Sequence, residues 1–175
     1  IHYLADLLSD DNQQQIPLGK QIKVLDIGTG ANLVYPLTGT SEYKWHFTGT
    51  DIDTASVKIA KQIAQFNGLK ITLKQQKNAS QIFKGVINQK DLYHLTLCNP
   101  PFHASEEEAS KGSERKWKNL GKTPSSTLNF GGHNNELWCE GGEVQFISNM
   151  VKESEDFAEQ VLWFTSLVSK KDNIA

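Results

Sequence analysis

The chain has few cysteines, no long apolar run and no marked excess of either charge. Its two cysteines, Cys98 and Cys139, lie at no spacing to each other or to a histidine that is typical of a zinc site. This scarcity argues against a disulfide-stapled secreted domain, so we expect a cytoplasmic protein without a metal. No apolar run approaches the roughly 18 residues of a membrane span, and no signal-peptide pattern opens the chain. Because 18 Lys+Arg nearly balance 20 Asp+Glu, any site for a polyanion must be local.

The 175 residues are most simply a single domain, 1–175, and alternate between strand-like and helical patterns. Strand-like runs lie at 22–27, 45–50, 69–73, 93–98 and 160–168, and helical stripes at 1–8, 55–66 and 144–157. This alternation predicts an α/β fold, a mostly parallel sheet with helices on both faces. We expect Asp53 to cap the helix at 55–66, whose apolar face comprises Ala55, Ile59, Ala60, Ile63 and Phe66.

The segment between the strand-like run at 93–98 and the helical stripe at 144–157 has a different character. Periodicity disappears from 103 to 137, which predicts a long loop of the kind that is usually functional or disordered. Because the chain starts at Ile1 and stops soon after its last strand-like run, we expect a piece of a longer protein that lacks the final strands of the sheet. We also expect a monomer.

A glycine turn follows the first strand-like run, in the sequence Asp26-Ile27-Gly28-Thr29-Gly30-Ala31-Asn32. Gly28 and Gly30 allow the backbone to approach a ligand closely, and the amides that open the next helix can hold a carboxylate. Asp51 follows about 20 residues later, at a strand end, where an acidic side chain can accept both hydroxyls of a ribose. These residues predict a nucleoside pocket.

The turn also narrows the class of cofactor. Nicotinamide cofactors usually require Gly-x-Gly-x-x-Gly, but the third position here is Leu33, so close approach to a pyrophosphate is not provided. Asp26 would repel a diphosphate and tolerate an ammonium or a sulfonium. S-adenosylmethionine carries a ribose, an amino acid and a positive sulfur, so we predict it as the cofactor. In the alternative interpretation, Gly28 and Gly30 only form a turn and Asp51 only caps a helix.

The sequence Asn99-Pro100-Pro101-Phe102 directly follows the strand-like run at 93–98. Prolines cannot donate backbone hydrogen bonds, so the strand must end here with its last carbonyls free as acceptors. An amine on an aromatic ring is a poor nucleophile because its lone pair is delocalised, and acceptors of its N–H bonds draw the nitrogen towards a tetrahedral shape. We predict that the Asn99 side chain and the Pro100 carbonyl are these acceptors, and that a base stacks on Phe102. The alternative is a plain turn with Phe102 in the core.

One basic cluster stands out beyond this sequence, and it comprises Lys111, Arg115, Lys116, Lys118 and Lys122, with Trp117 among them. Basic side chains beside an aromatic ring suit single-stranded RNA, whose bases can be splayed out and whose phosphates attract cations. We predict that Arg115, Lys116 and Lys118 contact a substrate RNA. The alternative is a solvated loop.

These motifs resemble those of class I S-adenosylmethionine-dependent methyltransferases that modify amino nitrogens. More closely, the chain resembles the bacterial ribosomal RNA large subunit methyltransferase F family, which methylates N6 of one adenine in 23S rRNA. The eukaryotic enzymes that N6-methylate an adenine of a spliceosomal RNA are similar. The resemblance spans most of the chain and rests on the segments 26–32, 97–103, 112–121, 128–132, 136–144 and 163–169.

The resemblance implies a role for each matching residue. Gly28, Gly30 and Asp51 would contact the cofactor, with Asp26 and Asn32 as further candidates. The sequence Asn99-Pro100-Pro101-Phe102 would hold the target adenine through Asn99, Pro100 and Phe102. The family pattern also includes a basic segment before Ile1 and a β-hairpin after Ala175.

Three other functions remain open from the sequence. A protein glutamine N5-methyltransferase needs the same two acceptors for its amide nitrogen. A DNA adenine N6-methyltransferase is another candidate, and a non-catalytic binding module with the same fold is a third. Cys98 could act as a thiolate in cytosine C5 chemistry, but burial at a strand end explains it equally well.

Overall fold

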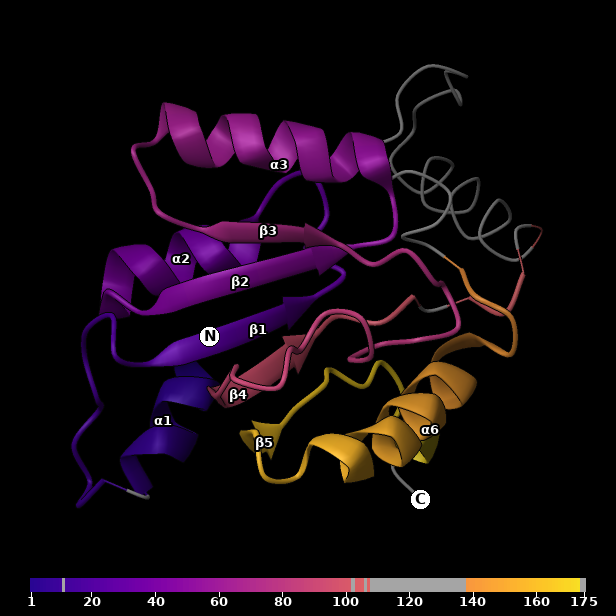
Figure 1. Ribbon diagram of the computed structural model, residues 1–175. Helices are drawn as coiled ribbons and strands as arrows, with labels where there is room; N and C mark the ends of the chain where they lie inside the picture. The colour runs from indigo at the N-terminus through magenta and orange to yellow at the C-terminus, as the bar shows by residue number, and fades with distance from the viewer. Residues whose placement is uncertain (11, 102, 106, 108–137, 174–175) are drawn as a thin grey trace, which may run out of the picture.

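The computed structural model describes residues 1–10, 12–101, 103–105, 107 and 138–173, and its centre is a five-stranded sheet (Figure 1). The strands are β1 Lys23–Ile27, β2 His46–Asp51, β3 Thr72–Gln75, β4 Tyr93–Cys98 and β5 Val161–Phe164. They lie in the order β3-β2-β1-β4-β5, and every neighbouring pair is parallel. The predicted α/β fold with a parallel sheet is therefore confirmed.

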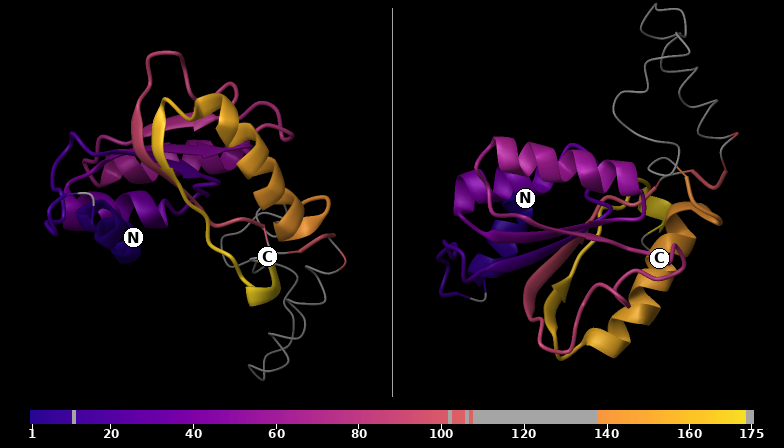
Figure 2. Two further views of the ribbon diagram at one scale, coloured as in Figure 1. Left: turned by 90° about the horizontal axis from the view of Figure 1, so that it is seen from below. Right: turned by 45° about the horizontal axis from the view of Figure 1, so that its top comes forward.

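Four α-helices and two short 3-10 turns accompany the described part of the sheet. The helices are α1 His2–Asp10, α2 Val34–Tyr43, α3 Thr54–Phe66 and α6 Gly142–Ser154, and the turns are η1 Glu155–Phe157 and η2 Lys171–Asn173. None of the described helices is long and apolar enough to cross a membrane. Figure 2 shows α6 on the side of the sheet away from α1.

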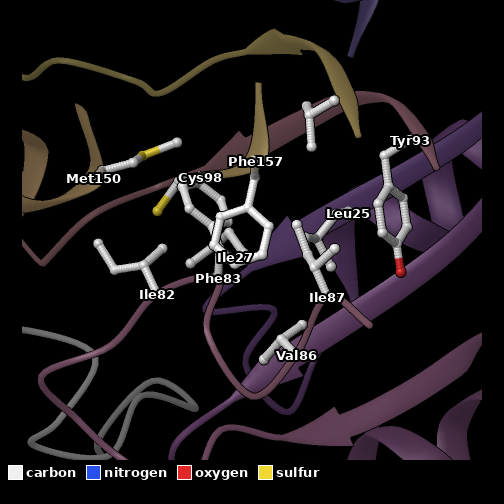
Figure 3. Close-up of a cluster of buried hydrophobic side chains, with 11 residues drawn as sticks. Leu25, Ile27, Ile82, Phe83, Val86, Ile87, Tyr93, Cys98, Met150 and Phe157 are labelled. Atoms are coloured by element: carbon white, nitrogen blue, oxygen red, sulfur yellow. The ribbon is translucent and has the colours of Figure 1, made fainter. Parts of the chain in front are cut away.

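Alternating side chains of the strands bury two apolar layers. On one face, Val24 and Phe47 pack with Ala5 and Leu8 of α1. On the other face, residues from β1, α6, η1 and the segment 82–87 point toward one another around Phe83 (Figure 3). Helices therefore cover both faces, as the alternation of strands and helices predicts.

The capping of α3 agrees with the sequence, whereas its buried face differs. Asp53 accepts hydrogen bonds from the N–H groups of the first helical turn, including that of Ser56 at 2.8 Å. The expected burial of Ile59 and Phe66 is wrong, because Ile59 is 41% exposed and Phe66 is 93% exposed. The expected position of Ala60 on the apolar face agrees with its burial at 0% exposure. The side chains that α3 buries are smaller than predicted, and they are Ser56, Val57, Ala60 and Ala64.

Two strands are shorter than predicted, for reasons visible in the backbone. β3 runs from Thr72 to Gln75, later in the chain than the predicted 69–73. Its start is delayed because the end of α3 reaches Leu69, where Gly68 has a φ of 64° and Leu69 N–H donates to the Ala64 carbonyl. β5 ends at Phe164 because the next residue, Thr165, turns its hydroxyl onto the Thr96 carbonyl at 2.6 Å. The chain stays beside β4 without continuing the regular ladder.

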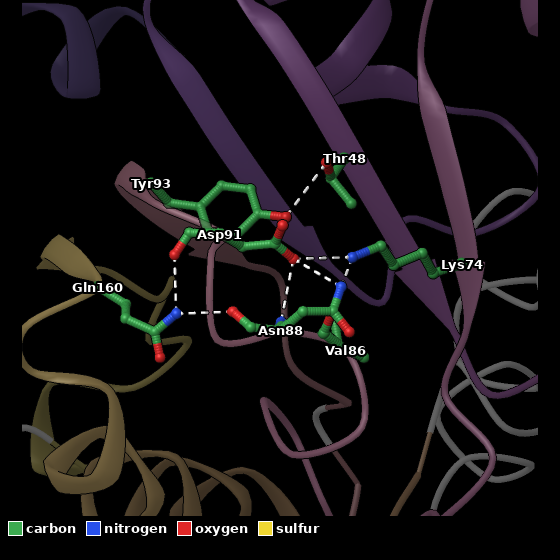
Figure 4. A network of polar contacts seen from close by, with 7 residues as sticks. All are labelled: Thr48, Lys74, Val86, Asn88, Asp91, Tyr93 and Gln160. Atoms are coloured by element: carbon green, nitrogen blue, oxygen red, sulfur yellow. Dashed lines mark hydrogen bonds and ion pairs between the residues drawn. The ribbon is translucent and has the colours of Figure 1, made fainter.

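A polar network holds the connection that leads into β4 (Figure 4). Lys74 of β3 donates to the Val86 carbonyl at 2.7 Å and pairs with Asp91 at 3.1 Å. The Gln160 side chain donates to the carbonyls of Asn88 and Asp91, at 2.7 and 2.8 Å. These bonds link β3 and the residue before β5 to the connection, and so fix where β4 enters the sheet.

Glu153, in the last turn of α6, binds the same connection from the other end. Its carboxylate accepts the consecutive backbone N–H groups of Ile82, Phe83 and Lys84, at 2.9, 2.8 and 2.5 Å. Hydrogen bonds to a charged group contribute about 1.5–3 kcal/mol each, more than neutral ones. Glu153 therefore ties α6 to the segment that fills the core beneath it.

We expect Glu153→Ala to lower the free energy of unfolding by about 2–3 kcal/mol, because three backbone donors lose their acceptor. Urea unfolding monitored by far-ultraviolet circular dichroism measures this change. Glu155→Ala is the matched control, since Glu155 is exposed two residues further on. Equal losses in the two variants would contradict the role assigned to Glu153.

Candidate functional site

The carboxyl ends of the three inner strands meet at one edge of the sheet. Ile27 at the end of β1 pairs with Thr50 of β2 on one side and with Cys98 of β4 on the other. In Figure 1 the arrowheads of β1 and β2 mark this edge, at the right of the view. The two motifs predicted from sequence, at Gly28 and at Asn99, therefore follow directly neighbouring strand ends. Open parallel sheets bind ligands at this place, where the strand order reverses.

The glycine turn is shaped by left-handed backbone and by a bond to β2. Gly28 and Gly30 have φ values of 68° and 62°, a region that favours glycine. Thr29 N–H donates to the Thr50 carbonyl at 2.8 Å, and Gly30 N–H donates to Asp51 Oδ2 at 2.9 Å. The predicted cofactor residues Gly28, Gly30 and Asp51 are thus brought together.

Asn32 lies further along, before the helix, and is exposed. The helix begins at Val34, after Leu33 takes a left-handed φ of 52° with its side chain fully buried. A left-handed conformation is unusual for a leucine, and burial in the cluster with Ala60 and Ala64 holds it there. The turn therefore extends through Leu33, and Asn32 lies outside α2.

Asp51 holds the turn and keeps acceptor capacity. Its Oδ2 accepts from Gly30 N–H and its Oδ1 accepts from Asp53 N–H at 2.8 Å. A carboxylate offers about four lone-pair sites, so both oxygens can still accept a further hydrogen bond. Burial raises the pKa of Asp51, while the N–H groups of Asp53 and Gly30 oppose that rise.

Asp26 is the less favourably placed of the two carboxyl groups. It is 1% exposed, and its Oδ2 accepts a 2.6 Å hydrogen bond from the Thr29 hydroxyl. Its Oδ1 is buried with no hydrogen-bond partner among the described residues. Burial raises the pKa of Asp26 to about 7, with the Thr29 hydrogen bond opposing the rise and the nearby charge of Asp51 adding to it. An unpaired buried acceptor of this kind favours a cationic or hydrogen-bond-donating ligand.

The Asn99-Pro100-Pro101 turn lies across from the glycine turn. Asn99 is exposed, Pro100 is buried, and no described residue donates to the Asn99 side chain or to the Pro100 carbonyl. The expectation that the last carbonyls of β4 are free is wrong for Cys98, whose carbonyl accepts from Leu167 N–H at 2.9 Å. The chain after β5 runs close enough to take that acceptor.

The structure also bears on the other residues of this region. Cys98 is 3% exposed in the core, and burial together with the charge of Asp26 raises the pKa of its thiol, which disfavours a thiolate nucleophile. Phe102 lies outside the described residues, and so do the predicted RNA contacts Arg115, Lys116 and Lys118. Of the predicted loop 103–137, the structure describes residues 103–105 and 107.

A contact that the sequence did not predict lies beside the turn. His103 and Trp138 form a parallel bridge, and Cys139 N–H donates to the His103 carbonyl at 3.1 Å. The Trp138 indole N–H is buried without a partner among the described residues. The segment that enters α6 therefore packs against the segment that leaves the turn at Asn99.

A parallel sheet with a glycine turn and an acidic strand end at its reversal point defines a doubly wound α/β domain. The family model Methyltransf_10, described as RNA methyltransferase, matches residues 1–175. The chain belongs to this family, which confirms the family-level resemblance of its motifs.

Two curated relatives illustrate the similarity. The chain is 85% identical over 175 residues to the ribosomal RNA large subunit methyltransferase F of Pseudoalteromonas translucida, a match that covers 100% of this chain and 56% of the relative. It is 56% identical over 180 residues to the protein of the same name from Pseudomonas putida strain GB-1, covering 99% of this chain and 57% of the relative. The chain thus spans little more than half the length of these relatives.

Solved structures share the fold. The hMettl16 catalytic domain in complex with the MAT2A 3′UTR hairpin 1 matches with a TM-score of 0.69 and 30% identity, over 87% of this chain and 52% of that chain. The N-terminal domain of human METTL16 in complex with SAH matches with a TM-score of 0.69 and 22% identity, over 99% of this chain and 55% of that chain.

We expect Asp26→Asn to change stability in a pH-dependent way. A raised pKa means that the folded protein keeps a proton which the unfolded chain releases between about pH 4 and about pH 7, so the wild type loses stability as pH rises through that window. The asparagine variant has no such loss. Urea unfolding should show its relative stability increasing by about 2 kcal/mol between about pH 5.5 and about pH 8.

The control for this experiment is Asp6→Asn, which removes one negative charge from an exposed position in α1. A stability difference between Asp26→Asn and wild type that is the same at both pH values would contradict the burial-driven shift at Asp26.

Proposed function

We propose that residues 1–175 form one methyltransferase domain that transfers a methyl group from S-adenosylmethionine to N6 of an adenine in 23S ribosomal RNA. The observation that carries this proposal is the pairing of Ile27 with Cys98, which sets the glycine turn beside Asn99 and Pro100. A nucleoside pocket and an acceptor pair for an amine then share one edge of the sheet. Membership of an RNA methyltransferase family and the names of the relatives support the choice of substrate.

The residues present fit S-adenosylmethionine. Asp51 has acceptor sites left for two ribose hydroxyls, and the exposed backbone of Gly28 allows close approach. The unpaired, buried oxygen of Asp26 provides negative potential for the cationic amino acid end. When bound, this cofactor supplies an electrophilic methyl group. The proposed holding residues are Asp26, Gly28, Gly30, Asn32 and Asp51.

The chain itself orients the nitrogen. The Asn99 side-chain oxygen and the Pro100 carbonyl each accept a hydrogen bond from one N–H group of the amine. These two hydrogen bonds turn the lone pair of the nitrogen out of the ring's π system. They also stabilise the positive charge that develops on the nitrogen as its bond to the methyl carbon forms and the sulfur–carbon bond breaks, and the methylated amine then releases one proton to water. Positioning of this kind can lower a barrier by roughly 7–11 kcal/mol, so no strong base is needed. Phe102 supplies the stacking face, and Arg115, Lys116 and Lys118 contact RNA phosphates in this proposal.

Calorimetric titration tests the cofactor pocket. We expect S-adenosylmethionine to bind, and Asp51→Ala to weaken its affinity by about two orders of magnitude, because charged hydrogen bonds to the ribose are lost and Gly30 loses its partner. Asp6→Ala on the exposed side of α1 is the control and should bind normally. Failure of the folded wild type to bind would contradict the cofactor assignment and favour a non-catalytic binding module.

We expect Asn99→Ala to leave cofactor affinity nearly unchanged and to lower turnover by about 100-fold to 1,000-fold, because one of the two acceptors is lost. Transfer of a radiolabelled methyl group to RNA measures the effect, with calorimetry as the check on cofactor binding. Unchanged turnover would refute the role of Asn99.

The same assay separates the possible substrates. The protein is offered 23S rRNA, a DNA oligonucleotide of matched sequence and a release-factor protein that contains glutamine. We expect methylation of the RNA, with N6-methyladenine as the product after nucleoside digestion. Preferential labelling of the DNA or of the protein would replace the RNA proposal with an adenine-DNA or a glutamine N5 activity. We also propose that the protein is cytoplasmic and monomeric.

A further inference from the structure

Glu143 is a buried carboxylate that neither the cofactor pocket nor the acceptor pair uses. It lies in the first turn of α6, is 3% exposed, and accepts three hydrogen bonds. Ser169 donates its N–H at 2.7 Å and its hydroxyl at 2.9 Å, and the Asn173 amide donates at 2.5 Å. Burial alone would raise the pKa of Glu143, but these bonds and the charge of Lys170 outweigh it, so the pKa is lowered.

An acidic residue in the first turn of a helix commonly stabilises that helix itself. Here the position before α6 is Gly141, and no side-chain hydrogen bond caps the helix. The Glu143 oxygens are directed to Ser169 and Asn173, which follow β5 in the chain. Glu143 therefore joins two segments that are distant in sequence, and helix capping does not account for its partners.

The first arm from Glu143 leads to the end of β4. Beyond β5, Thr165 binds the Thr96 carbonyl through its hydroxyl, and Leu167 N–H donates to the Cys98 carbonyl at 2.9 Å. Ser169, two residues later, is held by Glu143. This arm ends at the peptide group directly before Asn99.

The second arm leads to the other side of the same turn. Gly142 adjoins Glu143 and lies so close to Ala104 that a Cβ built on it would stand 3.4 Å from the Ala104 backbone. Gly142 N–H donates to the Cys139 carbonyl at 2.9 Å, and Cys139 N–H donates to the His103 carbonyl at 3.1 Å. This arm ends at the segment that leaves the turn.

We propose that Glu143 is a positioning residue that closes a ring of contacts around the Asn99–Pro101 turn and thereby holds the acceptors for the target amine. The ring runs from Cys98 through Leu167 and Ser169 to Glu143, and from there to Ala104. Two prolines restrict the backbone angles within the turn, but they do not fix the orientation of the turn relative to the sheet. The two arms hold its two ends. The role in catalysis rests on the proposed function of Asn99 and Pro100, whereas the mechanical coupling does not.

The test exchanges the two members of the Glu143–Asn173 pair. Glu143→Gln removes the charge that strengthens the hydrogen bonds from Ser169 and Asn173, and Asn173→Asp places a carboxylate against the Glu143 carboxylate, so each single variant weakens the hold of Glu143 on the ring. The double variant Glu143→Gln with Asn173→Asp restores one carboxylate and one amide, and the oxygen of the introduced glutamine still offers Ser169 an acceptor. A double-mutant cycle therefore separates the pair from a general loss of stability.

Hydrogen exchange in the free protein is the first measurement, because it requires no activity. We expect the amides of Asn99, His103 and Ala104 to exchange about tenfold faster in each single variant and to return towards wild-type rates in the double variant. Amides of β2 and α3 should be unchanged. Unaltered exchange around the turn in both single variants, or uniformly faster exchange across the whole chain without recovery in the double variant, would overturn the proposal.

Kinetics of methyl transfer is the second measurement. We expect each single variant to lower kcat by about tenfold, with little change in the affinity for S-adenosylmethionine, and the double variant to recover most of kcat. Loss of cofactor affinity in step with kcat would overturn the assignment to the turn. If the wild type transfers no methyl group, the proposed function fails, and the exchange measurement still decides whether Glu143 holds the turn.

Discussion

The pairing of β1 with β4 is the constraint on which the site depends. The glycine turn after β1 and the proline turn after β4 each comprise only a few residues, and neither forms a binding site alone. Parallel pairing brings the ends of two strands to the same edge, so Gly28 and Asn99 emerge side by side although α2, β2, α3 and β3 lie between them in the chain. A shift of this register by one residue would turn every side chain of β4 to the opposite face and separate the two motifs.

The same edge gathers two carboxyl groups in a region with little solvent. Asp26 and Asp51 are both nearly fully buried, and Asp26 has an oxygen with no hydrogen-bond partner among the described residues. A fold selected only for stability would place an apolar or neutral side chain at the position of Asp26. Its ionisation becomes less unfavourable beside a positive group, so part of the stability that burial of Asp26 costs is recovered as affinity for a cation.

Local patterns predicted much of the fold and the two turns that follow β1 and β4. The strand-like runs ending at Ile27 and Cys98, the capping by Asp53 and the glycine turn depend on neighbours in sequence, and the structure confirms them. The buried face of α3 was not predictable from apolar content, because packing against the sheet favoured small side chains over Phe66.

Other features depend on segments that meet only in three dimensions. The bond from Leu167 to the Cys98 carbonyl and the partners of Glu143 join positions far apart in the chain, and no spacing rule indicates them. A glutamate before an apolar helical stripe looks like an ordinary first-turn residue. The burial of its carboxylate, and the two polar residues that approach it after β5, become evident only once the sheet is assembled.

The carboxylate of Glu153 has a consequence for the order in which the protein matures. It holds the amides of residues 82–84 from a position 69 to 71 residues later in the chain. During synthesis the N-terminal part emerges first, and parallel pairings that enclose long connections form slowly. Until α6 has left the ribosome, the apolar side chains around Phe83 lack the cover that Met150 and Phe157 provide in the folded protein. We expect chaperones to bind nascent chains that expose the segment around Phe83 and do not yet include α6.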